Sequence, residues 1–195
     1  MAIEVRRIPG EEIRLYLADA AGLRISVFRE YPYLYDGDEA SEQEYLTSYL
    51  NCPRSVFVLA LDGGRVVGVS TGLPMADADE SFQAPFIAAG LPPEEWFYFG
   101  ESVLDPGYRG QGIGHRFFDE REGHARELGF RRTCFCSVIR PDDHPLKPAG
   151  YRPHDVFWTK RGYTRQAHLK ARFSWKQIDP PREVGNELVF WTREV

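Results

Sequence analysis

The 195-residue sequence has few cysteines, no long apolar run and no excess of basic residues. Its three cysteines cannot form a complete set of disulfides, so we expect a reducing compartment, the cytoplasm. The sequence contains no stretch of about eighteen apolar residues, the length needed to cross a membrane. The segment MAIEVRRIPG lacks the apolar core of a signal peptide. Because 24 Lys and Arg residues stand against 29 Asp and Glu residues, a general nucleic-acid-binding function is disfavoured.

The composition is that of one globular domain. Apolar residues make up 43% of the chain and aromatic residues 14%, which is enough for a single core, and we expect one domain over residues 1–195. The net charge of −5 is unevenly divided. Residues 1–100 carry 7 basic and 16 acidic residues, whereas residues 101–195 carry 17 basic and 13 acidic residues. Such a division is typical either of chance or of a protein that binds an anion and a cation at different places.

The periodicity of apolar residues predicts a mixed α/β fold with strands in the majority. Predicted helices cover residues 11–29, 41–50, 112–128 and 156–161. Predicted strands cover residues 3–8, 55–61, 65–73, 96–104, 132–139, 166–175 and 187–193, of which the last two would pair with each other. Ser41, with Glu44 three residues later, predicts a capping box at the start of the second helix. Residues 74–93, rich in proline and alanine, are predicted to form a connection.

The most informative segment is Leu-Asp-Pro-Gly-Tyr-Arg-Gly-Gln-Gly-Ile-Gly-His-Arg at residues 104–116. It joins a predicted strand to a predicted helix, and its alternate glycines let the backbone curve closely round a ligand. The first turn of a helix has unpaired N–H groups and the positive end of the dipole, which together favour an anion. Arg109, His115 and Arg116 are unfavourable at this helix end unless an anion binds there, which a phosphate group would explain.

This segment does not match the common nucleotide-binding motifs. Gly-x-Gly-x-x-Gly fails whether counting starts at Gly110 or Gly112, and Gly-Lys-Ser/Thr is absent. The pattern Arg109-x-x-Gly112-x-Gly114 resembles the signature of the GCN5-related N-acetyltransferase (GNAT) family, Gln/Arg-x-x-Gly-x-Gly/Ala between a strand and a helix. Phe-Trp-Thr-Lys-Arg-Gly-Tyr at residues 157–163 is similar to the family's late Phe-Tyr-x-Lys-x-Gly-Phe segment. The order of predicted elements also fits the family over almost the whole chain.

The resemblance implies a mixed, mostly antiparallel central sheet with flanking helices, whose fourth and fifth strands splay apart around acyl-CoA. It implies acetyl-CoA as the cosubstrate. No metal is expected, because Asp142, Asp143 and His144 could suggest a metal site but no second ligand cluster stands at a fitting spacing. Backbone groups of Ser102, Val103 and Leu104 would hydrogen-bond the pantetheine arm as a pseudo-strand. The N–H groups that would hold the pyrophosphate are those of Arg109, Gly110, Gln111, Gly112, Ile113, Gly114 and His115.

The implied reaction is attack of an amine on a thioester, which needs a group that accepts the proton of the amine. Glu101 is the candidate, because it is the only acidic or basic residue in the strand 96–104. A paired structural glutamate and a group that binds the acceptor are equally open roles for it. Family members often carry the acid one position earlier, where this chain has Gly100.

The general acid stays unassigned. Many relatives have a tyrosine that protonates the leaving thiolate, but the matching position is Trp158, which has no acidic proton to give. Tyr163 and Tyr151 are weaker candidates, and a CoA thiolate is a fair leaving group without a dedicated acid.

Three tyrosines, Tyr31, Tyr33 and Tyr35, lie where the family covers its acceptor site, and would either line a substrate pocket or pack on the core. We predict an N-acetyltransferase acting on a small amine, and the acidic first half of the chain favours a cationic one. The alternatives are a non-catalytic acyl-CoA sensor, which Trp158 favours, and an acetyltransferase acting on a protein amine. The expected partners are the small amine and, as an open alternative, a second copy in a homodimer; nucleic acid and membrane are not expected.

Overall fold

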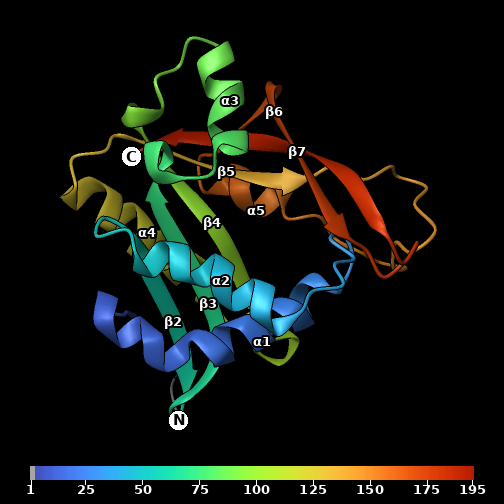
Figure 1. The fold of residues 1–195 in the computed structure, drawn as a ribbon, viewed down its shortest axis with the longest axis horizontal. Coiled ribbons are helices and arrows are strands. Elements are labelled where there is room, and N and C mark those ends of the chain that lie inside the picture. Colours follow the sequence, from blue (N-terminus) through green and yellow to red (C-terminus); the bar gives the residue numbers. More distant parts are fainter. Residues whose placement is uncertain (1–2) are drawn as a thin grey trace.

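Seven strands form one sheet in the order β1-β2-β3-β4-β5-β7-β6, as the computed structural model of residues 3–195 shows (Figure 1). All neighbouring strands are antiparallel except β4 and β5, which are parallel. The strands are β1 (Glu4–Arg7), β2 (Val56–Asp62), β3 (Arg65–Pro74), β4 (Trp96–Leu104), β5 (Arg132–Val138), β6 (Thr164–Lys176) and β7 (Glu183–Glu194). The predicted mixed, mostly antiparallel sheet is thereby confirmed, including the pairing of the last two strands.

Five α-helices flank this sheet. They are α1 (Leu17–Phe28), α2 (Glu39–Leu50), α3 (Glu80–Ala88), α4 (Ile113–Glu127) and α5 (Asp155–Lys160). The predicted first helix begins as a 3-10 turn over Gly10–Tyr16. Helix α3 lies in the segment predicted as a connection, so that part of the prediction was wrong. No helix of the described residues is long and apolar enough to cross a membrane.

Helix α2 is capped by Asp38 and not by Ser41. The Asp38 carboxylate accepts the backbone N–H of Ser41 at 3.0 Å and its hydroxyl at 2.7 Å. Because Ser41 donates this hydrogen bond, it lies inside the first turn, and the predicted capping box with Glu44 is wrong.

The two faces of the sheet are covered by different helices. Helices α1 and α2 cross one face, in front of β2–β4 in Figure 1, and α4 lies behind the sheet. In β4, Trp96 and Tyr98 pack in the core on the α1–α2 face. Phe97 and Phe99 pack in the core on the α4 face. The first half of β4 therefore alternates regularly between the two faces.

A β-bulge interrupts this alternation in the middle of β4. The strand register leaves two β4 residues, Gly100 and Glu101, opposite the single β3 residue Thr71. A Cβ atom at Gly100 would collide with the hydroxyl of Tyr49 on α2, so this position accepts only glycine without rearrangement. Beyond the bulge, Glu101 and Val103 point to the α1–α2 face. The extra residue therefore turns the Glu101 side chain away from α4.

Strands β4 and β5 are paired over three residues only. The pairs run from Trp96 with Arg132 to Tyr98 with Cys134, and the remainder of β4 has no pairing with β5. Strand β5 continues along β7 instead, as far as Val138. The two parallel strands therefore splay apart beyond Tyr98, as predicted, and this opening is called the β4–β5 gap below.

Candidate active site

Two residues of β4 direct their backbone groups into the β4–β5 gap. The N–H of Asp105 donates to the Val67 carbonyl of β3 at 2.9 Å. Since the backbone groups of successive strand residues point in alternate directions, Val103 also faces β3, whereas Ser102 and Leu104 face the gap. A ligand strand along β4 would therefore be held by Ser102 and Leu104. Val103 contributes a fully buried side chain to the core.

The start of α4 is arranged as an anion site at one end of the gap. Gly110 and Gly112 have φ values of 78° and 79°, in the left-handed region that favours glycine. Gly112 is the N-cap residue, no side chain caps the helix, and its first turn has no acidic residue. The N–H of Arg116 donates to the Gly112 carbonyl at 3.3 Å. The N–H groups that precede it, and that have no partner within the helix, are those of Ile113, Gly114 and His115.

Arg109 differs from the expectation for the pyrophosphate loop. Its N–H donates to the Pro106 carbonyl at 3.2 Å, so this group is already used in a turn. Its guanidinium pairs with Glu30 at 3.1 Å and donates through Nε to the Leu104 carbonyl at 3.3 Å. The series of N–H groups open to an anion therefore begins at Gly110, and the positive charge of Arg109 lies beside the gap.

The side chains of Gln111 and His115 turn back onto the protein. The Gln111 amide donates to the Gly107 carbonyl at 3.4 Å. The His115 ring packs edge-on against Phe157, with ring centroids 4.8 Å apart. What these two residues offer to an anion is therefore their backbone.

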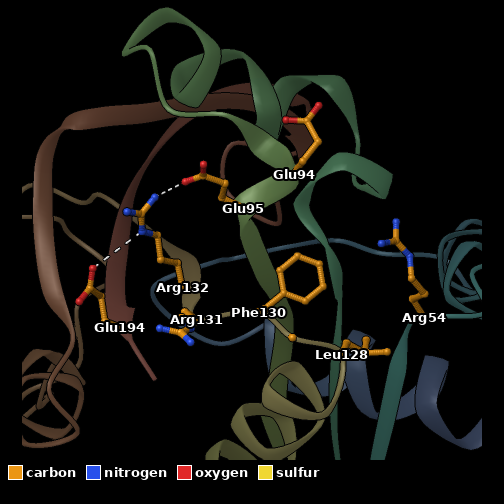
Figure 2. A pocket seen from close by; sticks show the side chains of 9 residues that line it. Arg54, Glu94, Glu95, Leu128, Phe130, Arg131, Arg132 and Glu194 are labelled. Carbon is orange, nitrogen blue, oxygen red and sulfur yellow. Dashed lines mark hydrogen bonds and ion pairs between the residues drawn. The ribbon is translucent and has the colours of Figure 1, made fainter.

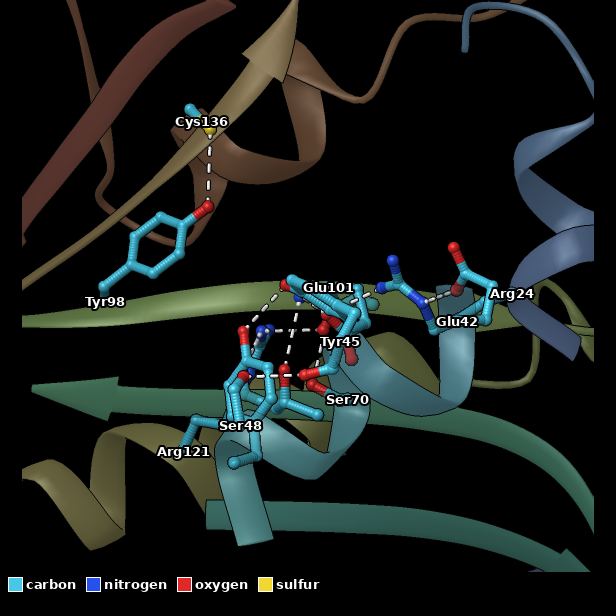
Figure 3. Close-up of polar contacts among 12 residues, drawn as sticks. Arg24, Glu42, Tyr45, Ser48, Ser70, Tyr98, Glu101, Arg121 and Cys136 are labelled. Atoms are coloured by element: carbon cyan, nitrogen blue, oxygen red, sulfur yellow. Dashed lines mark hydrogen bonds and ion pairs between the residues drawn. The ribbon is translucent and has the colours of Figure 1, made fainter. Parts of the chain in front are cut away.

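Glu101 lies in a buried cluster of charges on the α1–α2 face (Figure 3). Its Oε2 forms an ion pair with Arg24 Nη1 at 2.8 Å and accepts a hydrogen bond from Tyr45 Oη at 3.2 Å. Arg24 also forms an ion pair with Glu42, so one guanidinium is shared by two carboxylates. Within residues 3–195, Oε1 of Glu101 has no hydrogen-bond partner although it is fully buried. The predicted base is thus paired through one oxygen and free at the other.

The neighbours of Glu101 keep their protons. Burial acts to lower the pKa of Arg24, but Glu101, Tyr45 and Glu42 outweigh it and raise that pKa above its usual value. The pKa of Tyr45 is raised well above its usual value, by burial first and then by Glu101. Arg24 therefore stays charged and holds Oε2 as an ion pair, Tyr45 holds the same oxygen as a hydrogen-bond donor, and Oε1 is left to a ligand.

A buried arginine of α4 supports the bulge from the opposite face. Nη1 of Arg121 donates to the carbonyl of Thr71 at 3.4 Å and to that of Glu101 at 3.3 Å. Its guanidinium lies between the rings of Phe99 and Phe118, 4.3 and 4.8 Å from their centroids. Burial lowers the pKa of Arg121 to about 10, which leaves it charged at neutral pH. Arg121 thus satisfies carbonyl groups that the bulge exposes, and sequence analysis missed it.

Residues 24–147 match the sequence model of the Acetyltransferase (GNAT) family, which covers more than half of the chain. The chain belongs to the GNAT family. This family uses acetyl-CoA, and the β4–β5 gap with the glycine-rich turn fits that ligand. No curated protein sequence matches the chain.

Solved structures share the GNAT fold along the whole chain. An N-acetyltransferase from Staphylococcus aureus Mu50 is 12% identical, with a TM-score of 0.61, and the match covers 100% of this chain and 99% of that one. Polyamine N-acetyltransferase from Drosophila melanogaster is 14% identical, with a TM-score of 0.63 and full coverage of both chains. A putative acetyltransferase from Salmonella typhimurium, solved with acetyl-CoA, is 11% identical, with a TM-score of 0.61 and coverage of 100% and 94%. At these identities the likeness shows the shared fold.

The three tyrosines expected over the GNAT acceptor site have different surroundings. Tyr31 packs edge-on against Tyr151, with centroids 4.7 Å apart. The carbonyl of Tyr33 accepts hydrogen bonds from Arg140 at 3.0 Å and from Trp175 at 3.1 Å, which fixes the loop. The pKa of Tyr35 is raised by burial and then by its neighbour Glu42. Tyr35 is therefore the one that adjoins the charged cluster.

The candidates for a general acid are mostly committed elsewhere. Trp158 is partly buried and packs among aromatic rings. The Tyr163 hydroxyl is buried, donates to Glu122 at 3.1 Å and lies 3.0 Å from the hydroxyl of Thr133. Burial and Glu122 raise the pKa of Tyr163, so it is a poor proton donor. Tyr151 remains partly exposed, in contact with the loop that holds Tyr31.

A concave surface with a volume of about 710 Å³ lies where β4 and β5 begin (Figure 2). Glu101 is not among the residues that line it. Arg132 pairs there with Glu95 and with Glu194, at 3.8 Å from the latter. The lining of this concave surface has three arginines and three glutamates, so the surface carries no net charge. None of the described residues in the lining has a buried carboxylate oxygen without a partner, in contrast to Glu101. Among residues 3–195, no group of three or more His, Cys, Asp and Glu side chains is placed to hold a metal ion.

Proposed function

We propose that this GNAT protein transfers an acetyl group from acetyl-CoA to the amine of a small cationic molecule. The observation that carries the proposal is the free Oε1 of Glu101, on the strand that borders the β4–β5 gap. A buried carboxylate oxygen without a partner is costly, and an amine or ammonium N–H would satisfy it. The cluster of Arg24, Glu42 and Glu101 has one more carboxylate than guanidinium, which favours a cationic ligand.

The cosubstrate would be held mainly by the backbone. Ser102 and Leu104 would hydrogen-bond the pantetheine arm in the manner of an added strand. The N–H groups from Gly110 to His115 would bind the pyrophosphate at the positive end of α4. Acetyl-CoA supplies an acyl group that is activated as a thioester.

Glu101 would bind the acceptor and remove its proton. Because Arg24 and Tyr45 hold Oε2, the free Oε1 has a fixed direction and can accept an N–H of the incoming amine. Transfer of a proton to this carboxylate leaves the nitrogen lone pair free to attack. We assign no general acid, since Trp158 has no acidic proton and Tyr163 is bonded to Glu122.

A small acceptor is supported by the contact between Tyr31 and Tyr151, because it joins two loops and favours a covered site over an open groove for a protein. Structures that share this fold include the Drosophila melanogaster polyamine N-acetyltransferase and a ribosomal-protein-alanine N-acetyltransferase from Brucella melitensis. The fold alone therefore serves both acceptor classes, and the proposal rests on the site.

The second candidate function is an acyl-CoA sensor without turnover. Two observations favour it: Trp158 replaces the usual tyrosine, and Glu101 is engaged by Arg24. A sensor needs the gap and the α4 N-terminus but has no use for the free oxygen of Glu101.

The deciding experiment is a panel of amines assayed for thiol release from acetyl-CoA. Diamines and polyamines are expected to be acetylated, uncharged amines less so, and lysine-containing peptides least. Release with peptides alone would overturn the small-molecule acceptor. Tight binding of acetyl-CoA without release for any amine would establish the sensor.

A further inference from the structure

The side chain of Tyr98 on β4 reaches across to β5 at the point where the two strands separate. Tyr98 forms the last β4–β5 pair, with Cys134. Its hydroxyl lies 3.5 Å from Sγ of Cys136, two residues farther along β5 and past the last pair (Figure 3). The ring of Tyr98 therefore bridges the two strands at the closed end of the gap.

The surroundings of Tyr98 make this bridge rigid. Its side chain is 3% exposed, and its ring packs against Phe82 with centroids 4.7 Å apart. Burial, and then Cys136, raise the pKa of Tyr98 well above its usual value, so its hydroxyl stays neutral.

The direction of the gap places this bridge at the acyl end of a bound thioester. The anion site at Gly110–His115 lies at the opposite end of β4 from Tyr98, and Ser102 and Leu104 line the path between them. A ligand with its pyrophosphate on α4 and its arm along β4 therefore extends its other end toward the Glu101 bulge and Tyr98.

We infer that Tyr98 and Cys136 form a stop that sets the length of the acyl chain. An acyl chain that extends beyond this point would have to displace the Tyr98 ring from a close-packed core, so we expect acetyl to be favoured over butyryl. This inference rests on the proposed function, because it requires acyl-CoA in the β4–β5 gap.

The test is the affinity for acetyl-, propionyl-, butyryl- and hexanoyl-CoA, measured by calorimetry, which requires no knowledge of the acceptor. Wild-type protein should bind acetyl-CoA best. Tyr98→Ala should raise the affinity for butyryl-CoA relative to acetyl-CoA by at least about tenfold, since each methylene in an apolar pocket is worth about 10- to 200-fold. Tyr98→Phe should keep the wild-type preference, because the ring remains.

Phe86→Ala is the matched control. Phe86 is fully buried in the same core and packs against Phe190 and against Trp96, where β4 and β5 are still paired. It should lower stability and leave the chain preference unchanged. If Tyr98→Ala does not fold, Tyr98→Leu opens a smaller space and should favour propionyl-CoA.

An unchanged chain preference in folded Tyr98 variants, or an equal shift in Phe86→Ala, overturns the stop while the proposed function stands. Failure of the wild-type protein to bind any of the four thioesters overturns the proposed function and the stop together.

Discussion

Two buried glutamates lie on opposite faces of the sheet, and their partners differ. Glu122 of α4 is 3% exposed and Glu101 of β4 is 4% exposed. Both oxygens of Glu122 are engaged: Oε2 by Arg161 at 2.8 Å, and Oε1 by Arg193 at 3.0 Å and by Tyr163 at 3.1 Å. Glu101 has partners on Oε2 only. The two glutamates are therefore almost equally buried, but both oxygens of Glu122 have partners, whereas one oxygen of Glu101 has none.

The difference separates a structural carboxylate from one that can take a ligand. Glu122 is a single carboxylate between two guanidiniums, whereas Glu101 and Glu42 share the single guanidinium of Arg24. A buried charge needs compensation and a buried polar atom needs a partner, and Glu122 has both within the protein. Glu101 lacks one partner, which a bound amine would provide.

The largest effect is expected from the substitution Glu101→Gln, which should slow catalysis. The amide cannot accept a proton, so turnover should fall about a hundredfold, equal to about 2.7 kcal/mol of transition-state free energy. Affinity for acetyl-CoA should be nearly unchanged, because the residues that would hold it are intact. Thiol-release rates and calorimetry measure the two quantities. Full turnover in Glu101→Gln would remove the proposed role of this residue.

The matched substitution, Glu122→Gln, should act on stability instead. It leaves Arg193 without a carboxylate and Arg161 with Asp119 alone, and we expect a loss of about 2 kcal/mol in unfolding free energy. This is less than for a fully buried pair, because the two arginine side chains are 13% and 30% exposed. Urea denaturation measures the loss, and turnover per folded molecule should be preserved.

Glu127→Gln is the control for this stability effect. The Glu127 carboxylate is 62% exposed and pairs with Arg7 at 2.6 Å, so its loss should cost less than about 0.5 kcal/mol. Equal losses in the Glu122 and Glu127 variants would mean that the buried cluster contributes nothing special to stability.

A smaller effect is expected at the anion site. Gly114→Asp places a carboxylate in the first turn of α4, where it interacts favourably with the positive end of the helix dipole but would repel a bound phosphate. The melting temperature without ligand should be maintained or slightly raised, whereas acetyl-CoA affinity should fall about tenfold, or about 1.4 kcal/mol.

Gly114→Ala is the control, because its Cβ would lie 3.5 Å from the Phe157 ring, an ordinary contact. Thermal melts with and without acetyl-CoA compare the two variants. Identical ligand-induced shifts in both would argue that the pyrophosphate binds elsewhere.

The smallest effect concerns α2, which carries Glu42 and Tyr45 to the Glu101 cluster. Asp38→Ala removes the N-cap and should lower the unfolding free energy by about 1 kcal/mol. Glu44→Ala should cost less, since Glu44 takes no part in capping. Urea denaturation measures both losses. A larger loss in Glu44→Ala than in Asp38→Ala would support the predicted capping box over the Asp38 cap.

Strong local patterns were sufficient to predict much of the fold. The strand 96–104 has the predicted limits, and α4 begins one residue after the predicted position, because a continuous apolar run and a glycine-rich turn are distinct signals. Helix α3 was missed because it is short, contains Pro85 and packs on β6. Its existence depends on contacts between segments far apart in the sequence.

The charges around Glu101 were less predictable than the residue itself. Arg121 lies at helical spacing from Phe117 and Ala125, so a charged residue on an apolar stripe was a readable signal. Arg24 gives the same signal, since it lies at helical spacing from Ala20 and Ala21, but its helix alone does not indicate which strand it faces. The choice between Gly100 and Glu101 required the bulge, which only the pairing of β4 with β3 reveals.

That bulge also determines which kinds of mutation the site tolerates. A strand position exchanges its two faces whenever one residue is added or removed before it. Loss of the bulge with Gly100 retained would carry the Glu101 carboxylate to the α4 face, whereas deletion of Gly100 would straighten β4 and leave Glu101, then directly after Phe99, on the tyrosine-rich face. A related strand without the bulge would therefore carry its acid at the position of Gly100, and an alignment without a gap there would pair residues with opposite orientations.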